Sequence, residues 1–137
     1  MISVTRRYRF PAAHVLRSAE LSDAENEAIY GKCANPNGHG HDYGLEVTVT
    51  GPVDPRSGEI VAPGRLDAIV RERALERFGY RLLNDDPCFR AAVPTAENLA
   101  IVIHRELAEP VAREGARLRR VRVIETRRNS FEYEETR

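Results

Sequence analysis

The stretch Asp42-Tyr-Gly-Leu-Glu-Val-Thr-Val-Thr-Gly51 alternates apolar and polar side chains along its whole length. Successive side chains of a β-strand point to opposite faces, so this pattern predicts a strand with one buried and one solvated face. Such strands are typical of an antiparallel sheet that is covered on one side. The apolar face consists of Tyr43, Leu45, Val47 and Val49, and the polar face of Glu46, Thr48 and Thr50.

Three further segments are predicted to form strands of the same sheet. Ile2–His14 alternates in the same way, and an irregular end is expected at Pro11. Near the C-terminus, Arg119–Thr126 and Ser130–Glu134 are predicted as two strands joined by a tight turn near Asn129.

The segment between the predicted strands Asp42–Gly51 and Arg119–Thr126 contains a turn and two helices. Asp54–Gly58 has turn chemistry, and Glu59–Val61 is expected to return as a short strand of a hairpin. Thr95 is the predicted N-cap of the second helix, with Glu97 in its first turn. Apolar residues recur at helical spacing in two runs: Leu66, Ile69, Val70, Ala74 and Phe78, then Leu99, Val102, Ile103, Leu107 and Val111.

The order strand, strand, helix, helix, strand, strand predicts an α+β fold. It consists of a four-stranded antiparallel sheet with two helices on one face. A length of 137 residues with 42% hydrophobic residues is enough for one core, so residues 1–137 are expected to form a single domain. The exposed edges of such a sheet need pairing or covering, which favours an oligomer.

Composition excludes several classes of partner. Twenty-one basic residues balance twenty-one acidic ones, so the basic excess of a nucleic-acid-binding protein is absent. No apolar run approaches the roughly 20 residues that cross a bilayer, and the N-terminus lacks the order of a signal peptide. Two cysteines, Cys33 and Cys88, are interpreted as thiols in the cytoplasm. We therefore expect no nucleic-acid and no membrane partner.

Three of the four histidines occupy positions that favour a metal site. His39 and His41 lie two residues apart in extended chain, so both rings project from one face, and His14 ends the first strand on its apolar face. Three neutral imidazoles around Zn²⁺ leave one tetrahedral position open, as in catalytic sites. On spacing alone, a polar loop with a buried structural histidine explains the pattern equally well. His104, on the second helix, is interpreted as structural.

Cys33 is a candidate base because it precedes His39 by six residues. A thiol acts as a base only as thiolate, and both Lys32 and a bound Zn²⁺ would lower its pKa. The alternative is a small buried cysteine without a chemical role, which is the interpretation for Cys88.

Glu125 is a second candidate, because it shares the parity of Val121 and Val123 on the apolar face of a strand. An inward carboxylate needs hydrogen-bond donors, and the edge of a pterin or guanine offers them in pairs. A strand end that points into solvent is equally compatible with the sequence.

Four motifs together resemble the 6-pyruvoyltetrahydropterin synthase and 6-carboxytetrahydropterin synthase family, and they span essentially the whole chain. The spacing C-x5-H-G-H is more similar to the pyruvoyl enzymes than to the carboxy enzymes. The resemblance implies the tunnelling fold, in which trimers form a barrel and two trimers stack as a homohexamer. The motifs are Phe10-Pro-Ala-Ala-His14, Gly31-Lys-Cys-Ala-Asn-Pro-Asn-Gly-His-Gly-His-Asp-Tyr43, Pro94-Thr-Ala-Glu-Asn98 and Val123-Ile-Glu-Thr126.

The resemblance also implies a function and a set of site residues. It implies a zinc-dependent lyase that cleaves a carbon–oxygen or carbon–carbon bond in the side chain of a reduced pterin such as 7,8-dihydroneopterin triphosphate, in tetrahydrobiopterin or queuosine biosynthesis. By similarity, zinc binds to His14, His39 and His41, and the catalytic residues are Cys33, as the base, and Glu125, which also anchors the pterin ring. Thr95 and Glu97 line the pocket of the ring.

One position departs from the family. An Asp-His pair usually follows the first long helix, whereas Phe78–Asn84 places Gly79 and Tyr80 there. Two interpretations stay open: a divergent lyase that works without the pair, and a catalytically retired module that still binds zinc and a pterin or purine-like ligand. The double substitution Gly79→Asp and Tyr80→His is the sequence-based test between them.

Overall fold

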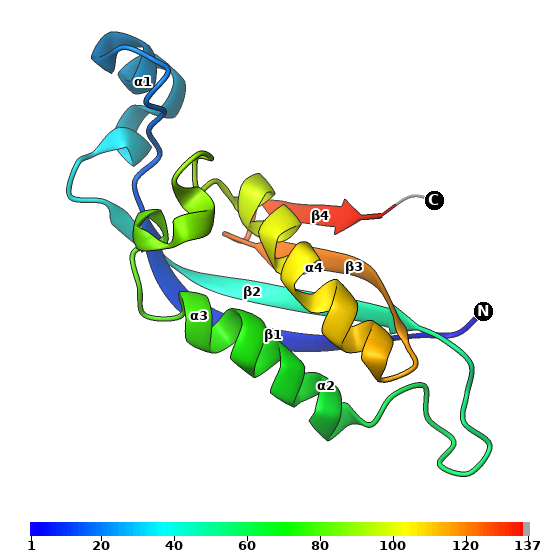
Figure 1. Cartoon of the computed structure of the whole chain (residues 1–137). Helices are drawn as coiled ribbons and strands as arrows, with labels where there is room; N and C mark the ends of the chain where they lie inside the picture. The colour runs from blue at the N-terminus through cyan, green and yellow to red at the C-terminus, as the bar shows by residue number, and fades with distance from the viewer. Residues whose placement is uncertain (136–137) are drawn as a thin grey trace.

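The computed structural model describes residues 1–135 and consists of one four-stranded antiparallel sheet in the order β1-β2-β3-β4. Helices α2, α3 and α4 cover one face of this sheet, and α1 lies beyond one end of it (Figure 1). The strands are β1 Ser3–His14, β2 His39–Thr50, β3 Arg117–Ile124 and β4 Ser130–Glu134. The helices are α1 Asp23–Tyr30, α2 Pro63–Val70, α3 Glu76–Phe78 and α4 Ala96–Arg113, with short helical turns η1 Gly31–Ala34, η2 Arg71–Leu75, η3 Leu83–Asp85 and η4 Pro87–Phe89.

The predicted α+β fold is confirmed, and the long pair β1–β2 dominates it. The pairing runs from Ser3 opposite Thr50 to His14 opposite His39. β1 continues through Pro11, so the irregular end expected there is wrong. A proline is tolerated because β1 is an edge strand, where the missing N–H breaks no ladder.

The short strand predicted at Glu59–Val61 is also wrong, although the turn before it is confirmed. Gly58 has a φ of +77°, and the amide of Asp54 donates to the carbonyl of Glu59 over 2.9 Å. Both edges of β2 are already paired, with β1 and β3, so Glu59–Val61 has no free edge of β2 to join. This segment is a loop whose apolar residues pack against the core.

The core lies between the sheet and the helices, as the two periodicities predict. The helical segment from Pro63 to Phe78 is continuous in the chain but contains one π-helical turn, η2. α4 begins at the predicted cap, where the Thr95 hydroxyl accepts from the amide of Asn98 over 3.2 Å. The buried apolar residues of the two runs are Leu66, Val70, Ala74, Phe78, Leu99, Val102, Ile103, Leu107 and Val111.

A polar contact on the covered face ties β1 to α2. Arg6 donates two hydrogen bonds to the carboxylate of Asp67, at 3.1 and 2.7 Å, and the Tyr8 hydroxyl donates to the same carboxylate over 2.7 Å. These hydrogen bonds lower the pKa of Asp67, and burial raises the pKa of Tyr8. The contact fixes the helix over the edge strand.

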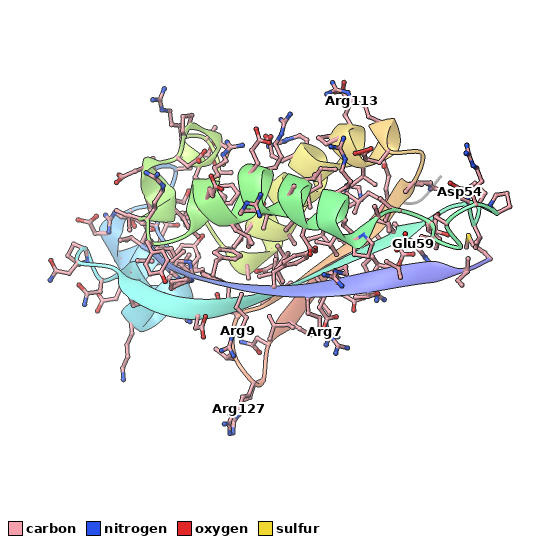
Figure 2. The ribbon with its side chains drawn as sticks, turned by 90° about the horizontal axis from the view of Figure 1, so that it is seen from below. Arg7, Arg9, Asp54, Glu59, Arg113 and Arg127 are labelled. Atoms are coloured by element: carbon pink, nitrogen blue, oxygen red, sulfur yellow. The ribbon has the colours of Figure 1, made fainter. Side chains whose placement is uncertain are left out.

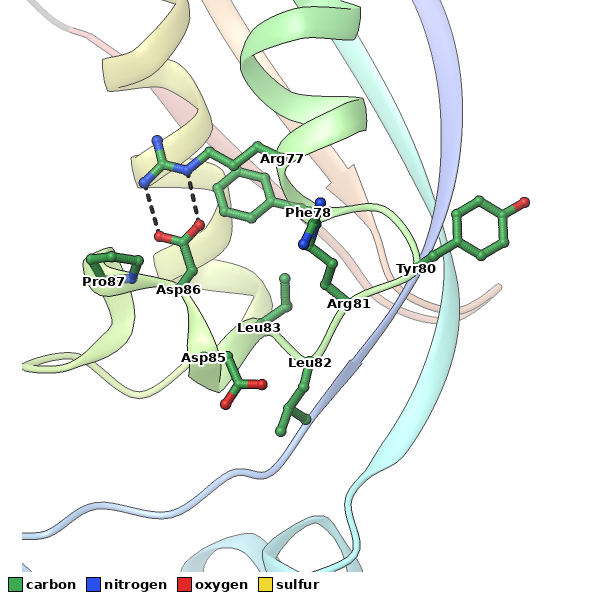
Figure 3. A pocket seen from close by; sticks show the side chains of 9 residues that line it. All are labelled: Arg77, Phe78, Tyr80, Arg81, Leu82, Leu83, Asp85, Asp86 and Pro87. Atoms are coloured by element: carbon green, nitrogen blue, oxygen red, sulfur yellow. Dashed lines mark hydrogen bonds and ion pairs between the residues drawn. The ribbon is translucent and has the colours of Figure 1, made fainter.

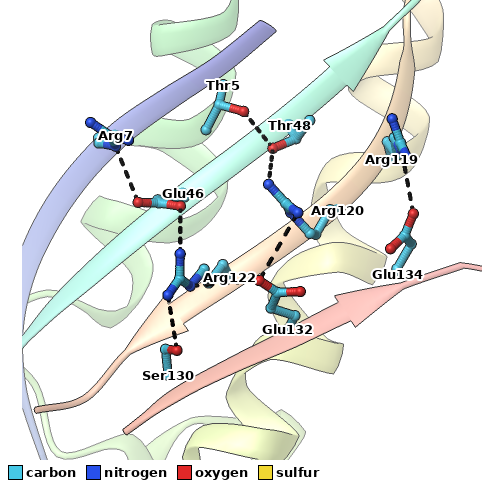
Figure 4. Close-up of polar contacts among 10 residues, drawn as sticks. All are labelled: Thr5, Arg7, Glu46, Thr48, Arg119, Arg120, Arg122, Ser130, Glu132 and Glu134. Carbon is cyan, nitrogen blue, oxygen red and sulfur yellow. Dashed lines mark hydrogen bonds and ion pairs between the residues drawn. The ribbon is translucent and has the colours of Figure 1, made fainter. Parts of the chain in front are cut away.

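The opposite face of the sheet is charged. Arg7, Arg9 and Arg127 extend from it, away from the helices (Figure 2). Glu46 accepts from Arg7 over 3.1 Å and from Arg122 over 3.5 Å, within a ladder of polar contacts across all four strands (Figure 4). Glu46 is only 12% exposed and Arg122 36%, whereas Arg7 is 80% exposed, so the ladder is only partly solvated. Among residues 1–135, no helix is long and apolar enough to span a membrane.

His104 is buried in α4, as the structural interpretation predicts. It is 3% exposed, and its ring meets that of Tyr133 edge-on with centroids 4.7 Å apart. Its Nε2 has no hydrogen-bond partner among the described residues. Burial lowers the pKa of His104, and the charge of Glu135 opposes this shift more weakly.

His104 is therefore expected to make the free energy of unfolding depend on pH. The lowered pKa favours the neutral ring in the folded state, so its contribution is complete above pH 6.5. Below that it is lost, by up to about 1.4 kcal/mol for each pH unit, until the pKa of the folded state is reached. Urea denaturation of the wild type and of His104→Phe between pH 7.5 and 5, both with a chelator, measures the difference. Parallel curves for the two proteins would contradict the expectation.

Candidate active site

The ends of β1 and β2 bring three histidines together. His14 and His39 are directly opposite in the strand register, and His41 lies two residues further along the same face of β2. One ring nitrogen from each lies within 4.8 Å of the other two. His14 is fully buried, and His39 and His41 are half-buried. The predicted convergence of the three imidazoles is confirmed.

The Nδ1 side of the His14 ring, opposite the nitrogen that faces His39, makes two polar contacts. Nδ1 lies 2.8 Å from the carbonyl oxygen of Pro94 and 3.2 Å from the hydroxyl oxygen of Tyr43. A carbonyl only accepts, so Nδ1 carries the hydrogen and Nε2 keeps its lone pair. That Nε2 lies 2.8 Å from Nε2 of His39, on the side where the three rings meet.

The surroundings favour the neutral form of His14 and His39. Burial lowers the pKa of His14 to about 4. The hydrogen bond to Pro94 opposes this shift, and the charges of His39 and His41 add to it. Burial is the main cause that lowers the pKa of His39, and the charge of His41 is the second. A metal needs the unprotonated imidazole, so binding at neutral pH displaces little or no proton from these two rings. The three nitrogen donors fit a divalent cation such as Zn²⁺ with one position left open.

Glu125 points toward the histidines. It follows the last residue of β3, because that strand ends at Ile124 rather than at the predicted Thr126. One carboxylate oxygen lies 3.9 Å from Nε2 of His41, and the side chain is 16% exposed. The solvent-directed alternative is therefore wrong.

Cys33 lies in η1 and is a half-buried free thiol. Its carbonyl accepts from the amide of Leu16 over 2.8 Å, which ties η1 to the chain just beyond His14. Burial is the main cause that raises the pKa of Tyr43, whose hydroxyl contacts His14, and the charge of Glu125 adds to it. Lys32 is exposed, and no hydrogen bond in the described part of the chain joins it to Cys33.

The side chains of Thr95 and Glu97 make no polar contact with the three histidines among the described residues. Thr95 is half-buried and caps α4, while Glu97 is exposed on its first turn. Within residues 1–135, no hydrogen bond or ion pair links either side chain to the three histidines. The contact from this motif comes from the main chain, through the carbonyl of Pro94.

Sequence reasoning missed two groups at this site, Tyr43 and the Pro94 carbonyl. Tyr43 was assigned only to the apolar face of its strand. Its parity with His39 and His41 is a signal that was available, since residues of one parity line one face. The Pro94 carbonyl has no signal of its own in the sequence, because any residue supplies a carbonyl.

A family model described as 6-pyruvoyl tetrahydropterin synthase matches residues 3–136. The chain belongs to this family. It is 40% identical over 131 residues to the 6-pyruvoyl tetrahydrobiopterin synthase of Homo sapiens, covering 95% of this chain and 89% of the human protein. The protein of the same name from Poecilia reticulata is 39% identical, over 95% of this chain and 88% of its own length. The solved 6-pyruvoyl tetrahydropterin synthase of Caenorhabditis elegans superposes with a TM-score of 0.89 at 36% identity, covering 98% and 96% of the two chains.

At the position that departs from the 6-pyruvoyl tetrahydropterin synthase pattern, the backbone itself excludes a larger side chain. A Cβ atom at Gly79 would lie 2.5 Å from the carbonyl oxygen of Leu75. Tyr80 follows with a φ of +60°, and its amide donates to the carbonyl of Pro11 over 2.6 Å. Its ring is 90% exposed and extends away from the pocket that Arg77 and Asp86 close on the other side (Figure 3).

Restoring the Asp-His pair is therefore expected to destabilise the protein at position 79 but not at position 80. Gly79→Asp should lower the free energy of unfolding by about 2 kcal/mol or more, because the main chain must move to relieve the clash. Tyr80→His should stay within about 0.5 kcal/mol of the wild type, since the ring is exposed. Urea denaturation of the two single variants tests this. A Gly79→Asp variant as stable as the wild type would contradict it.

Proposed function

We propose that this chain is a zinc-dependent lyase that acts on the side chain of a reduced pterin such as 7,8-dihydroneopterin triphosphate. The observation that carries the proposal is the meeting of three imidazole nitrogens within 4.8 Å beside the carboxylate of Glu125. The names of the human and Poecilia reticulata relatives support the pyruvoyl-forming reaction, which eliminates triphosphate.

His14, His39 and His41 would hold the zinc. When bound, the ion supplies a Lewis acid that polarises substrate oxygens and lowers the pKa of a hydroxyl group. The buried His14 fixes the base of the site, and the half-buried His39 and His41 leave the opposite side open to a substrate.

The protein residues would bind and move protons. The carboxylate of Glu125 would accept paired hydrogen bonds from the amide-like edge of the pterin and orient the ring. Cys33 would take a proton from the side-chain carbon beside a hydroxyl group and return it during isomerisation. Thr95 and Glu97, on the helix whose start touches His14, would line the pocket for the ring.

The open edges of the sheet support a homohexamer of two stacked trimers. Residues Tyr80–Leu82 cover only the end of the β1 edge, where the amide of Ala13 donates to the carbonyl of Arg81 over 2.9 Å. The rest of β1 and the outer edge of β4 have no strand partner among residues 1–135. Pairing between copies would cover both edges. The free thiols Cys33 and Cys88 support a cytoplasmic location. The balance of 21 basic and 21 acidic residues supports a protein without a nucleic-acid partner, and we propose no membrane partner.

A second candidate function follows from Gly79 and Tyr80. The missing Asp-His pair and the outward ring of Tyr80 favour a retired module that binds zinc and a pterin or purine-like ligand without turnover. Because Gly79 does not accommodate a side chain, restoring the pair does not separate the two functions. Product analysis of the native sequence does.

Incubation of the zinc-loaded protein with 7,8-dihydroneopterin triphosphate should release triphosphate, or a two- or three-carbon aldehyde, detected by mass spectrometry. Cys33→Ser should lower kcat by about 100-fold or more, the usual contribution of a positioned base. Cys88→Ser is the matched control. Burial and the neighbouring Asp86 raise the pKa of Cys88 to about 12, so it is not expected to act as a thiolate.

Three outcomes decide between the functions. Turnover that depends on Cys33 but not on Cys88 supports the lyase. Calorimetric binding of the pterin without any product, even at high enzyme concentration, supports the retired module. Neither binding nor turnover by zinc-loaded protein would overturn both.

A further inference from the structure

The buried face of His14 is contacted by two oxygen atoms that no part of the proposed reaction uses. Nδ1 lies 2.8 Å from the Pro94 carbonyl and 3.2 Å from the Tyr43 hydroxyl, on the side away from the other two imidazoles. A ligand ring that is held only through its metal can still turn about the metal–nitrogen bond. A ring that also donates from its other nitrogen has a fixed plane and a fixed tautomer.

The Pro94 carbonyl is itself held in place by the start of α4. The Thr95 hydroxyl accepts from the amide of Asn98, and the Asn98 side chain donates to the carbonyl of Val93 over 2.8 Å. The amide of Thr95 donates to the same Val93 carbonyl over 2.8 Å. Pro94 thus lies between two residues whose polar groups are engaged, and its carbonyl cannot turn away from His14 without breaking the helix cap.

The hydroxyl of Tyr43 is equally constrained. The residue is fully buried, and its ring stacks on Phe10 with centroids 5.3 Å apart. Its ring is also edge-on to that of His14, at 6.3 Å between centroids. A hydroxyl at this depth needs a polar partner, and Nδ1 of His14 is the one within hydrogen-bond distance.

We propose that the Pro94 carbonyl and the Tyr43 hydroxyl are positioning groups: the carbonyl sets the Nδ1–H tautomer of His14, and both fix the plane of its ring so that Nε2 faces the other two imidazoles. The proposal rests on the metal site of the proposed function but not on pterin turnover. It assigns a main-chain role to the Pro94–Asn98 motif, because the capped start of α4 directs the carbonyl of Pro94 toward His14. Removing an outer partner of a metal ligand costs about 10- to 100-fold in metal affinity.

The test compares two variants that each delete one tyrosine hydroxyl from β1 or β2. Tyr43→Phe removes the oxygen beside His14 and is expected to weaken zinc binding by about 10-fold. Tyr8→Phe removes a hydroxyl that donates to Asp67, so it should change zinc affinity less than twofold while also lowering stability. Zinc affinity is measured by competition with a chromophoric chelator, without any pterin, and thermal unfolding confirms that both variants fold.

The tautomer gives a readout of the Pro94 carbonyl that a merely structural role of this loop would not move. Long-range proton–nitrogen correlation spectra of the chelator-treated wild type should show His14 protonated at Nδ1. Tyr43→Phe keeps the carbonyl and should keep this tautomer, whereas Asn98→Ala should show a mixture of tautomers. Asn98→Ala, which frees the loop that carries Pro94, should weaken zinc binding in the same direction and provides the test if Tyr43→Phe does not fold. A wild-type His14 protonated at Nε2, or Tyr43→Phe with unchanged zinc affinity, would overturn the proposal.

Discussion

The in-register pairing of β1 with β2 is the constraint on which the site depends. It places His14 opposite His39, and the pleat then puts His41 on the same face. A shift of one residue would move every side chain of one strand to the other face. His39 and His41 would then point toward the charged face, away from His14. The apolar residues that fix this register, Tyr43 to Val49 on alternate positions, therefore also fix the cluster of three histidines.

The same pairing explains why the ring of His14 is neutral. His14 is the last residue of β1 and lies under the start of α4, so it is buried between sheet and helix. Burial lowers the pKa of His14, and a neutral ring is the form that binds a cation. The helix thus shields the ligand from water and supplies the Pro94 carbonyl that orients it. Half-buried His39 and His41 leave the other side accessible, which is the arrangement a substrate requires.

Sequence alone was sufficient where the chemistry is carried by side chains at regular spacing. Alternation predicted β2, helical spacing predicted α2 and α4, and the His-x-His pair predicted two of the three histidines that meet at the site. It failed where tertiary packing or the main chain decides: Glu59–Val61 forms no strand because β2 has no free edge, and Gly79 has no room for a Cβ because the Leu75 carbonyl is too close. The side chains of Thr95 and Glu97 do not contact the histidines within the described residues, whereas the carbonyl of Pro94 beside them does.

The coordination of the bound metal distinguishes this site most directly from any other use of the same residues. X-ray absorption at the zinc edge, on protein purified without added chelator, should show three imidazole nitrogens at about 2.0–2.1 Å and one further light ligand, without sulfur. Substitution of His14, His39 or His41 by alanine should each remove one imidazole from the spectrum or abolish zinc binding. A sulfur ligand from Cys33, fewer than three imidazoles, or protein that binds no transition metal would contradict the three-histidine centre.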